Sequence, residues 1–491
     1  MNLARLRPEF AQLCLLLAVL FNSACAVPLA PGYKITKETR NIEFVPDSPA
    51  RLEIHLSFTV QNSGTTPLSF IDIDFPEEHA FGRKNLRAQL DGREVKLEEL
   101  PEEYRPDHPN TLRIAFDSTW ARGQTHQLAF NYLLSSPEDS GSRITMSAEA
   151  FHLGPQGWTA LPQPPNHLLA PYPRRPDKTT YSVRVPSGFV VLGRGKLVSK
   201  KRQGDETEFL FQLRRTDLAP FAVAGHYIET PFRVTAGTVI FWTLHPLRGN
   251  PGPGPERIAA AWATLQTVFG PLDVRGHALH VVESPSLRSR ILGESVPAVA
   301  SFPGGALVNE DTLALGLESD EFVRRVSHAL AHNWFSDQMY PTGAAALAMR
   351  EGIPEYATIV IDESTGGSQA RQLRILGYLR LYDDAAKQAQ EKPLGVTVLT
   401  DSPQQRAIAL AKAPLMYVAL EDTCGETPVR NGLKGLVILL RGQQVGFDDM
   451  RAAIEQTCGK DLGEFFRSWL YSKGLPANFR GRYDQRQSAD K

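Results

Sequence analysis

The strongest constraint on the fold is a change in hydrophobic period near residue 230. From Tyr33 to about Tyr227 apolar and polar residues alternate repeatedly, as they do between Leu52 and Val60. A period of two places apolar side chains on one face of a strand, and clusters of Gly, Pro, Asn and Asp separate the runs. We therefore expect an antiparallel β domain over residues 27–230.

The pattern after residue 230 is different. A strand-like run, Val239–Trp242, precedes a Pro/Gly linker and a helical run at Glu256–Phe269. Beyond Ser319 the apolar spacing is mostly helical. The expected helices are Asp320–Ser336, Pro354–Ser364, Ser368–Ala389, Gln404–Asp422, Pro428–Arg441, Phe447–Thr457 and Leu462–Ser472. The chain is thus predicted to be an α+β multidomain protein, with a second domain at 231–491 whose C-terminal half is mostly helical.

The N-terminus has the pattern of a targeting segment. Arg5 and Arg7 precede an apolar run, Phe10–Phe21, and small residues follow at Ser23–Ala26. The run is shorter than the roughly 20 residues that cross a bilayer, so residues 1–26 are predicted to be a cleaved signal peptide. Cys25 is an alternative site for a lipid anchor. Both interpretations predict an exported protein, either periplasmic or extracellular. A lipid anchor at Cys25 would in addition make it a membrane-anchored lipoprotein.

Charge and cysteine content narrow the function further. The 53 Lys and Arg residues balance 54 Asp and Glu residues, so the chain lacks the basic excess that nucleic-acid binding requires. Outside the targeting segment only Cys424 and Cys458 remain. In an oxidising compartment they can pair, but the sequence gives no Cα separation, and two unbridged thiols remain the alternative.

Two histidines on the expected helix Asp320–Ser336 carry the chemistry. His328 and His332 are four residues apart, which allows both imidazoles to bind one ion. With 12 histidines in the chain, about 0.3 such pairs arise by chance, so the pair alone is weak support. Glu351 follows after 18 residues and could complete a His-His-Glu site that leaves one position open for water. Without a metal, the histidines would be core residues and Glu351 a helix-start acid.

Together these residues resemble the gluzincin aminopeptidases of the membrane alanyl aminopeptidase and leukotriene hydrolase type. That family has HExxH, 18 residues and then Glu. Its landmarks match the segments His328–Phe335, Glu351–Tyr356, Gly157–Trp158, Phe221–Tyr227 and Phe465–Pro476. The resemblance implies an N-terminal antiparallel β domain, a thermolysin-like metallopeptidase domain, and one Zn²⁺ held by His328, His332 and Glu351.

The same resemblance identifies positions where catalytic groups are missing. Ala329 stands at the general-base position, where the family has Glu. The segment Gly305–Asn309 resembles the GAMEN phrase, which implies substrate binding at Gly305 and Ala306, but Val308 replaces the acidic residue that holds a substrate's amino group. The resemblance therefore identifies no catalytic acid or base on this chain.

The oxyanion-binding Tyr of the family is also missing. Leu410 stands at its position, and Tyr417 lies two helical turns away. Losing general acid–base catalysis costs about 10²–10⁴-fold in rate, and losing one oxyanion donor costs about 10²–10³-fold.

Three functions follow from these observations. The first is an exported zinc-binding pseudopeptidase that binds peptides or a protein partner without cutting them. The second is an active zinc metallopeptidase or aminopeptidase that uses zinc-bound hydroxide and an unidentified proton carrier. The third is a β-rich adhesion or scaffold module without metal.

Overall fold

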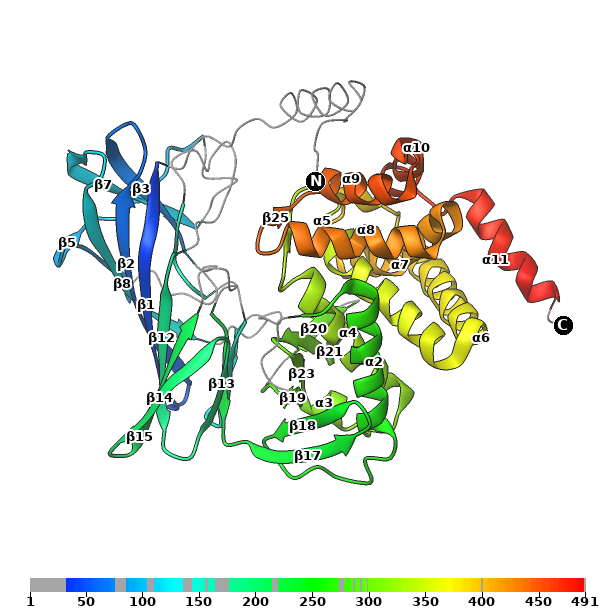
Figure 1. Cartoon of the computed structure of the whole chain (residues 1–491), viewed down its shortest axis with the longest axis horizontal. Coiled ribbons are helices and arrows are strands. Elements are labelled where there is room, and N and C mark those ends of the chain that lie inside the picture. The colour runs from blue at the N-terminus through cyan, green and yellow to red at the C-terminus, as the bar shows by residue number, and fades with distance from the viewer. Residues whose placement is uncertain are drawn as a thin grey trace, which may run out of the picture.

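The computed structural model describes residues 32–75, 85–103, 110–135, 144–154, 158–163, 176–213, 220–272, 278–285, 288–291, 294–297, 299–398 and 401–489. It has a β-rich part and a part that combines a sheet with many helices (Figure 1). The predicted signal peptide, Cys25 and Gly157 lie outside the described residues.

The largest sheet belongs to the N-terminal part. Its strands are β1 (Tyr33–Val45), β2 (Arg51–Asn62), β4 (Arg87–Leu90), β5 (Arg93–Val95), β8 (Thr125–Ser135), β12 (Thr179–Pro186), β14 (Lys196–Gln203) and β15 (Glu206–Leu213). They lie in the order β14-β15-β12-β1-β2-β8-β4-β5. All neighbours are antiparallel except β1 and β12. Buried and more exposed residues alternate along β2, as the period of two predicts.

Two four-stranded sheets complete this part. One has the order β13 (Val190–Gly193), β16 (Ala222–Gly225), β10 (Ala150–Leu153) and β9 (Ile144–Met146). The other has the order β11 (Leu161–Pro162), β3 (Leu68–Asp74), β7 (Thr111–Trp120) and β6 (Glu98–Glu99). Side chains from the three sheets share one apolar core, which includes Ile54, Phe130 and Trp158.

The second part is built on a mixed five-stranded sheet. Its order is β17 (Ile228–Val234), β18 (Gly237–Thr243), β19 (Ala278–Glu283), β23 (Gly305–Val308) and β22 (Val299–Phe302). The pairs β18–β19 and β19–β23 are parallel, and β22 runs antiparallel to β23. Two short pairs are added by β20 (Arg288–Ile291) with β21 (Glu294–Pro297), and by β24 (Tyr340–Pro341) with β25 (Gln444–Val445).

Helices cover this sheet and continue to the C-terminus (Figure 1). They are α2 (Gly254–Phe269), α3 (Glu310–Leu313), α4 (Asp320–Phe335), α5 (Ala346–Arg350), α6 (Gly352–Ala386), α7 (Pro403–Cys424), α8 (Glu426–Leu439), α9 (Phe447–Cys458), α10 (Gly463–Phe466) and α11 (Ala477–Ala489). A 3₁₀ turn, η2, spans Leu394–Val396, and a π-helical turn, η3, spans Arg467–Tyr471. The α+β class and the helical C-terminal half are confirmed.

The helix boundaries differ from prediction in two places. The expected helices Pro354–Ser364 and Ser368–Ala389 form one element, α6, with a kink at Gly367. Gly367 has φ of 71°, a conformation that glycine adopts without a side-chain clash. The expected helix Leu462–Ser472 divides into α10 and the π-helical turn.

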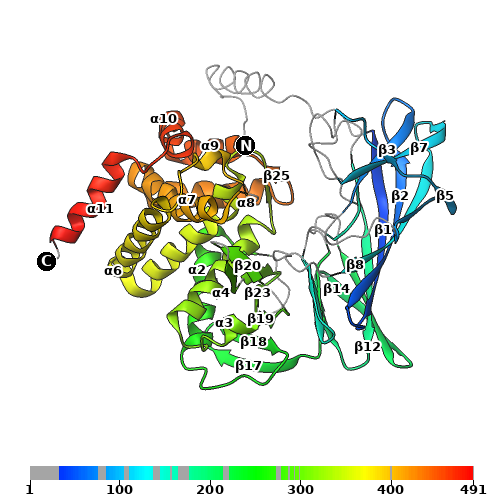
Figure 2. The same ribbon diagram turned by 180° about the vertical axis from the view of Figure 1, so that it is seen from behind.

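The two parts meet through an apolar cluster of their own. Phe221 and Val223 from the β-rich part pack with Trp242, Val282 and Leu307 from the second sheet. Hydrogen bonds cross the same contact, from the Tyr227 hydroxyl to the Glu283 carbonyl at 2.7 Å and between the hydroxyls of Thr145 and Ser284 at 2.8 Å. Seen from behind, the β-rich part lies beside the sheet of the second part (Figure 2).

Cys424 and Cys458 form a disulfide, with their Cα atoms 5.3 Å apart. The structure thus decides between the two alternatives left by the sequence. The bond joins the ends of α7 and α9, on either side of α8. None of the described helices is long and apolar enough to cross a membrane.

Candidate metal centre

Helix α4 is fixed in rotation by its ends and by one apolar ridge. The Ser319 hydroxyl accepts a hydrogen bond from the Phe322 N–H at 3.1 Å, which caps the first turn. Ridge residues Phe322, Val326, Leu330 and Trp334 recur every four positions and are fully buried. The Trp334 indole donates to the Gly270 carbonyl at 2.8 Å, which anchors the far end of the helix to the end of α2.

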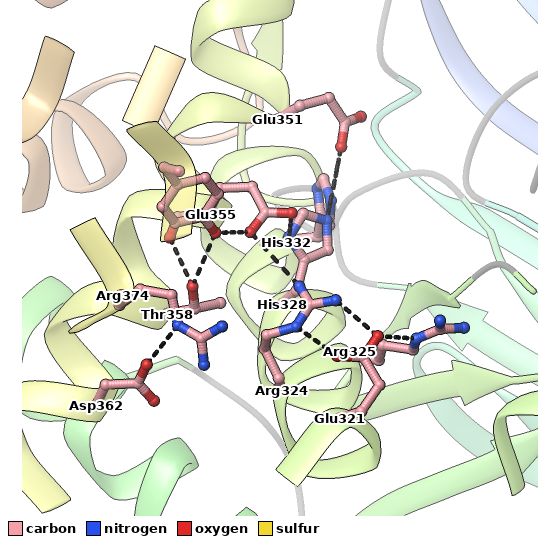
Figure 3. A network of polar contacts seen from close by, with 11 residues as sticks. Glu321, Arg324, Arg325, His328, His332, Glu351, Glu355, Thr358, Asp362 and Arg374 are labelled. Carbon is pink, nitrogen blue, oxygen red and sulfur yellow. Dashed lines mark hydrogen bonds and ion pairs between the residues drawn. The ribbon is translucent and has the colours of Figure 1, made fainter. Parts of the chain in front are cut away.

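The opposite side of α4 carries the two histidines. The Nε2 atoms of His328 and His332 are 2.9 Å apart. Glu351 lies between α5 and α6, and its Oε2 is 3.6 Å from Nε2 of His328 and 3.3 Å from Nε2 of His332. The three predicted ligands therefore converge (Figure 3).

The donor set fits zinc. Ligand atoms about 2.0–2.1 Å from a tetrahedral ion lie roughly 3.3–3.4 Å from one another, and the three observed separations bracket that value. Two imidazoles and one carboxylate are the protein ligands of a zinc site that keeps a fourth position open. In the described part of the chain, this is the one group of His, Cys, Asp and Glu residues close enough to hold a metal.

Each histidine is oriented by a contact on its other nitrogen. Nδ1 of His332 hydrogen-bonds the Ser336 hydroxyl at 2.8 Å. Nδ1 of His328 lies 3.2 Å from Oε1 of Glu355. The Ser336 hydrogen bond and the Glu355 charge contact lie on the Nδ1 side of each ring, which leaves Nε2 to face an ion.

Glu355 is a site residue that the sequence reasoning missed. It accepts a hydrogen bond from the Tyr378 hydroxyl through Oε2, and Arg324 approaches the same oxygen at 3.9 Å (Figure 3). The detectable signal was its spacing, because Glu355 lies four residues, about one helical turn, after Glu351, the residue that precedes α6.

The acidic groups make the site favour positive charge. Burial opposes charge on His328, but Glu355 and Glu351 outweigh it and raise the pKa of that imidazole. Burial likewise opposes charge on Glu355, yet His328, Arg324 and the Tyr378 hydroxyl lower the pKa of that carboxyl. A divalent cation supplies the positive charge that this arrangement attracts.

The positions where the resemblance implies that catalytic groups are missing hold apolar, packed residues. Ala329 is fully buried in the core. Leu410, on α7, packs against the same core. The Tyr417 hydroxyl donates to the Ala348 carbonyl at 3.2 Å, and its ring is buried, so this phenol already has a structural partner.

The predicted substrate-binding residues are also enclosed. Gly305 and Ala306 lie on β23, which is hydrogen-bonded to β19 on one side and to β22 on the other. Val308 is fully buried in the core shared with α4. Among the described strands the edges of this sheet are β17 and β22, and Gly305 and Ala306 lie on neither, so their assignment to substrate binding stays a prediction.

Comparison with solved structures places this fold among two-domain zinc peptidases. The M1 zinc metallopeptidase from Deinococcus radiodurans superposes with a TM-score of 0.60 at 18% identity, covering 91% of this chain and 95% of that one. A Glu-to-Ala mutant of that peptidase gives a TM-score of 0.61 at 18% identity, covering 91% and 96%. The same mutant bound to Tyr-Ser-Ala gives 0.58 at 17%, covering 91% and 95%.

The resemblance to gluzincins is therefore confirmed in the fold, which is that of an M1 zinc metallopeptidase. No protein-family sequence model matches the chain, and a search of curated proteins finds no match.

Proposed function

We propose that the protein is an exported, aminopeptidase-like zinc-binding protein that holds peptides or a protein partner without hydrolysing them. Ala329 carries this proposal, because a methyl group stands where the related peptidases need a carboxylate. Zinc, a single ion in this proposal, would be held by His328, His332 and Glu351, and it would supply a Lewis acid and an acidified water.

The acid beside the site does not substitute for the missing base. Glu355 contacts Nδ1 of His328, whereas the ion-facing atom of that ring is Nε2. The imidazole ring therefore lies between the Glu355 carboxylate and Nε2, the atom that would hold the ion. A general base must come within hydrogen-bond distance of the proton it accepts, and the contacts of Glu355 point elsewhere.

Peptide hydrolysis also requires a proton for the departing amine. Zinc lowers the pKa of its water to about 7, so hydroxide forms near neutral pH without a carboxylate. Without general acid–base catalysis, however, the rate falls by about 10²–10⁴-fold. The active metallopeptidase remains the second candidate because of this hydroxide.

The solved relatives support peptides as the ligand class. The mutant of the Deinococcus radiodurans enzyme, in which alanine replaces one glutamate, was solved with the substrate Tyr-Ser-Ala. A protein of this fold therefore holds a tripeptide when that glutamate is absent. We extend this property to the present chain as part of the proposal.

Hydrolysis assays test the proposal directly. The purified mature protein, with its zinc content measured, is incubated with aminoacyl substrates and internally quenched peptides. We expect about one zinc per chain and no chelator-sensitive turnover. Turnover that a chelator abolishes would favour the active metallopeptidase, and a zinc-free protein would favour the scaffold module.

Export is tested separately. Sequencing the N-terminus of the protein recovered from its native compartment locates the cleavage site, and a blocked, lipidated Cys25 would identify the anchored form.

A further inference from the structure

An arginine adjoins the third metal ligand on the side away from the histidines. Arg350 is the last residue of α5, and its Nε lies 3.5 Å from Oε1 of Glu351. The other carboxylate oxygen, Oε2, faces the two imidazoles. The Glu351 carboxylate therefore faces the proposed metal position with one oxygen and contacts the Arg350 guanidinium with the other.

The guanidinium of Arg350 has spare hydrogen-bonding capacity. Among the described residues its ion-pair partner is Glu351, and no hydrogen bond engages its side chain. The side chain is 29% exposed, so it is partly desolvated yet reachable from solvent. A guanidinium in such a position gains strongly from an anionic partner, because planar N–H pairs match the two oxygens of a carboxylate.

The nearby carboxylates are already engaged. Glu351 faces the imidazoles, and Glu355 contacts His328 and Tyr378. Asp337 is buried, and its ion-pair contact within 4 Å is with Arg194, at 3.9 Å from Oδ2, an atom that has no hydrogen bond among the described residues.

Two acidic residues that the resemblance places at this centre are replaced, because Ala329 and Val308 stand at their positions. A divalent ion held by two neutral imidazoles and the Glu351 carboxylate would carry a net charge of +1, two from the ion minus one from the carboxylate. Arg350 adds a second positive charge beside them, and this favours an anionic ligand.

We infer that Arg350 binds the carboxylate of a peptide C-terminus or a free amino acid at this centre. The inference rests on the proposed function and names the ligand group that the site recognises. It predicts a preference opposite to that of an aminopeptidase, because the contact is made to the acid end of the ligand and not to its amine.

Calorimetric binding to the zinc-loaded protein tests the inference. The probes are Tyr-Ser-Ala with a free carboxylate, the same peptide as a C-terminal amide, and the N-acetylated acid. We expect the acid to bind about tenfold more tightly than the amide, as one charge-assisted contact provides, and N-acetylation to have little effect. The variant Arg350→Gln should lose the preference for the acid while retaining zinc.

Arg374→Gln is the matched control. Arg374 is equally exposed, at 29%, and it is paired with Asp362 at 2.6 Å on the same helix (Figure 3). It should retain the acid preference. Equal affinity for acid and amide, no peptide binding at all, or an unchanged preference in Arg350→Gln would overturn the inference.

The readouts separate this inference from the proposed function. A purely structural role for Arg350 would reduce zinc content or affinity for acid and amide alike, which also contradicts the inference. Peptide cleavage by the unmodified protein would contradict the proposed function, and the carboxylate preference would then be read from the KM values for acid and amide.

Discussion

The candidate metal centre contains positions that would hold a metal and positions that, by the resemblance, would move protons. The first set keeps the expected polar side chains, and the second does not. The metal-holding set keeps its ligands, and Ser336 and Glu355 orient the rings of His332 and His328. The proton-moving set, which is the general-base position that the resemblance implies, holds Ala329, buried in the core, and the oxyanion position holds Leu410, which packs against that core. Ion binding and turnover are separate properties, because orienting a ligand and accepting a proton are done by different groups.

The largest expected effect comes from breaking the metal-holding set. His328→Ala removes one of three ligands, so zinc recovered with the purified protein should fall from about one per chain to near zero. Metal analysis after gel filtration measures this. His126→Ala is the control, because His126 is also partly buried but pairs with Asp91 outside the site. Full zinc retention by His328→Ala would contradict the site.

Restoring the proton-moving set should give the next largest effect. Ala329→Glu returns a carboxylate to the general-base position, and we expect peptide turnover to rise by about 10²–10⁴-fold over the unmodified protein. Ala329→Gln introduces a side chain of the same shape as glutamate that cannot act as a base, so it should show no gain in peptide turnover. If Ala329→Glu folds and retains zinc yet shows no gain, the missing carboxylate does not account for the absence of turnover that we propose.

A smaller effect should follow from changing Glu355. Glu355→Gln keeps the shape but removes the charge that orients His328, so zinc affinity should fall about 10–100-fold. Competition with a chromogenic chelator measures this. Glu363→Gln, in the Arg371 and Arg430 ion-pair group, should leave zinc affinity unchanged. An unaltered affinity in Glu355→Gln would show that His328 needs no orienting carboxylate.

The smallest expected effect is on stability, and it comes from His152. This histidine is buried like those of the metal centre, but within the part of the chain that the structure describes it has no carboxylate or hydroxyl contact of the kind that they have. His152 is fully buried on β10, and neither of its ring nitrogens has a hydrogen-bond partner among the described residues. Burial lowers the pKa of His152 to about 3 from 6.5. The unfolded chain therefore binds a proton that the folded chain excludes.

This proton uptake should make stability depend on pH. As pH falls from about 6.5 toward 3, His152 should cost about 1.4 kcal/mol of unfolding free energy per pH unit. Urea unfolding at pH 6.5, 5.5 and 4.5 should show a shallower decline for His152→Leu than for the unmodified protein. If the unfolding free energy of the two proteins falls equally, His152 takes up a proton in the folded protein as it does in the unfolded chain.

The convergence of the candidate metal ligands could be predicted from sequence because part of their spacing is local. His328 and His332 share a face of α4 by helical periodicity, and the resemblance supplied Glu351. The fold class was predictable for the same reason, since a period of two changes to helical spacing near residue 230.

The surroundings of the site depend on non-local contacts. β23 is enclosed because it pairs with β19 on one side and β22 on the other, and no local pattern records the pairing with β19. Arg350 and Glu355 flank Glu351 in sequence, but their roles follow from which atoms they approach in space. Packing around Leu410 and Tyr417 is likewise fixed by other helices.

The bond between Cys424 and Cys458 also bears on how the protein is produced. It closes a segment in which the two cysteines are 34 residues apart, and such a closure limits the unfolded ensemble by roughly 3–4 kcal/mol in the chain-entropy account. A reducing cytosol would withhold that contribution from the helices α7 to α9. Recombinant protein expressed in a reducing cytosol would therefore be less stable than protein matured under oxidising conditions.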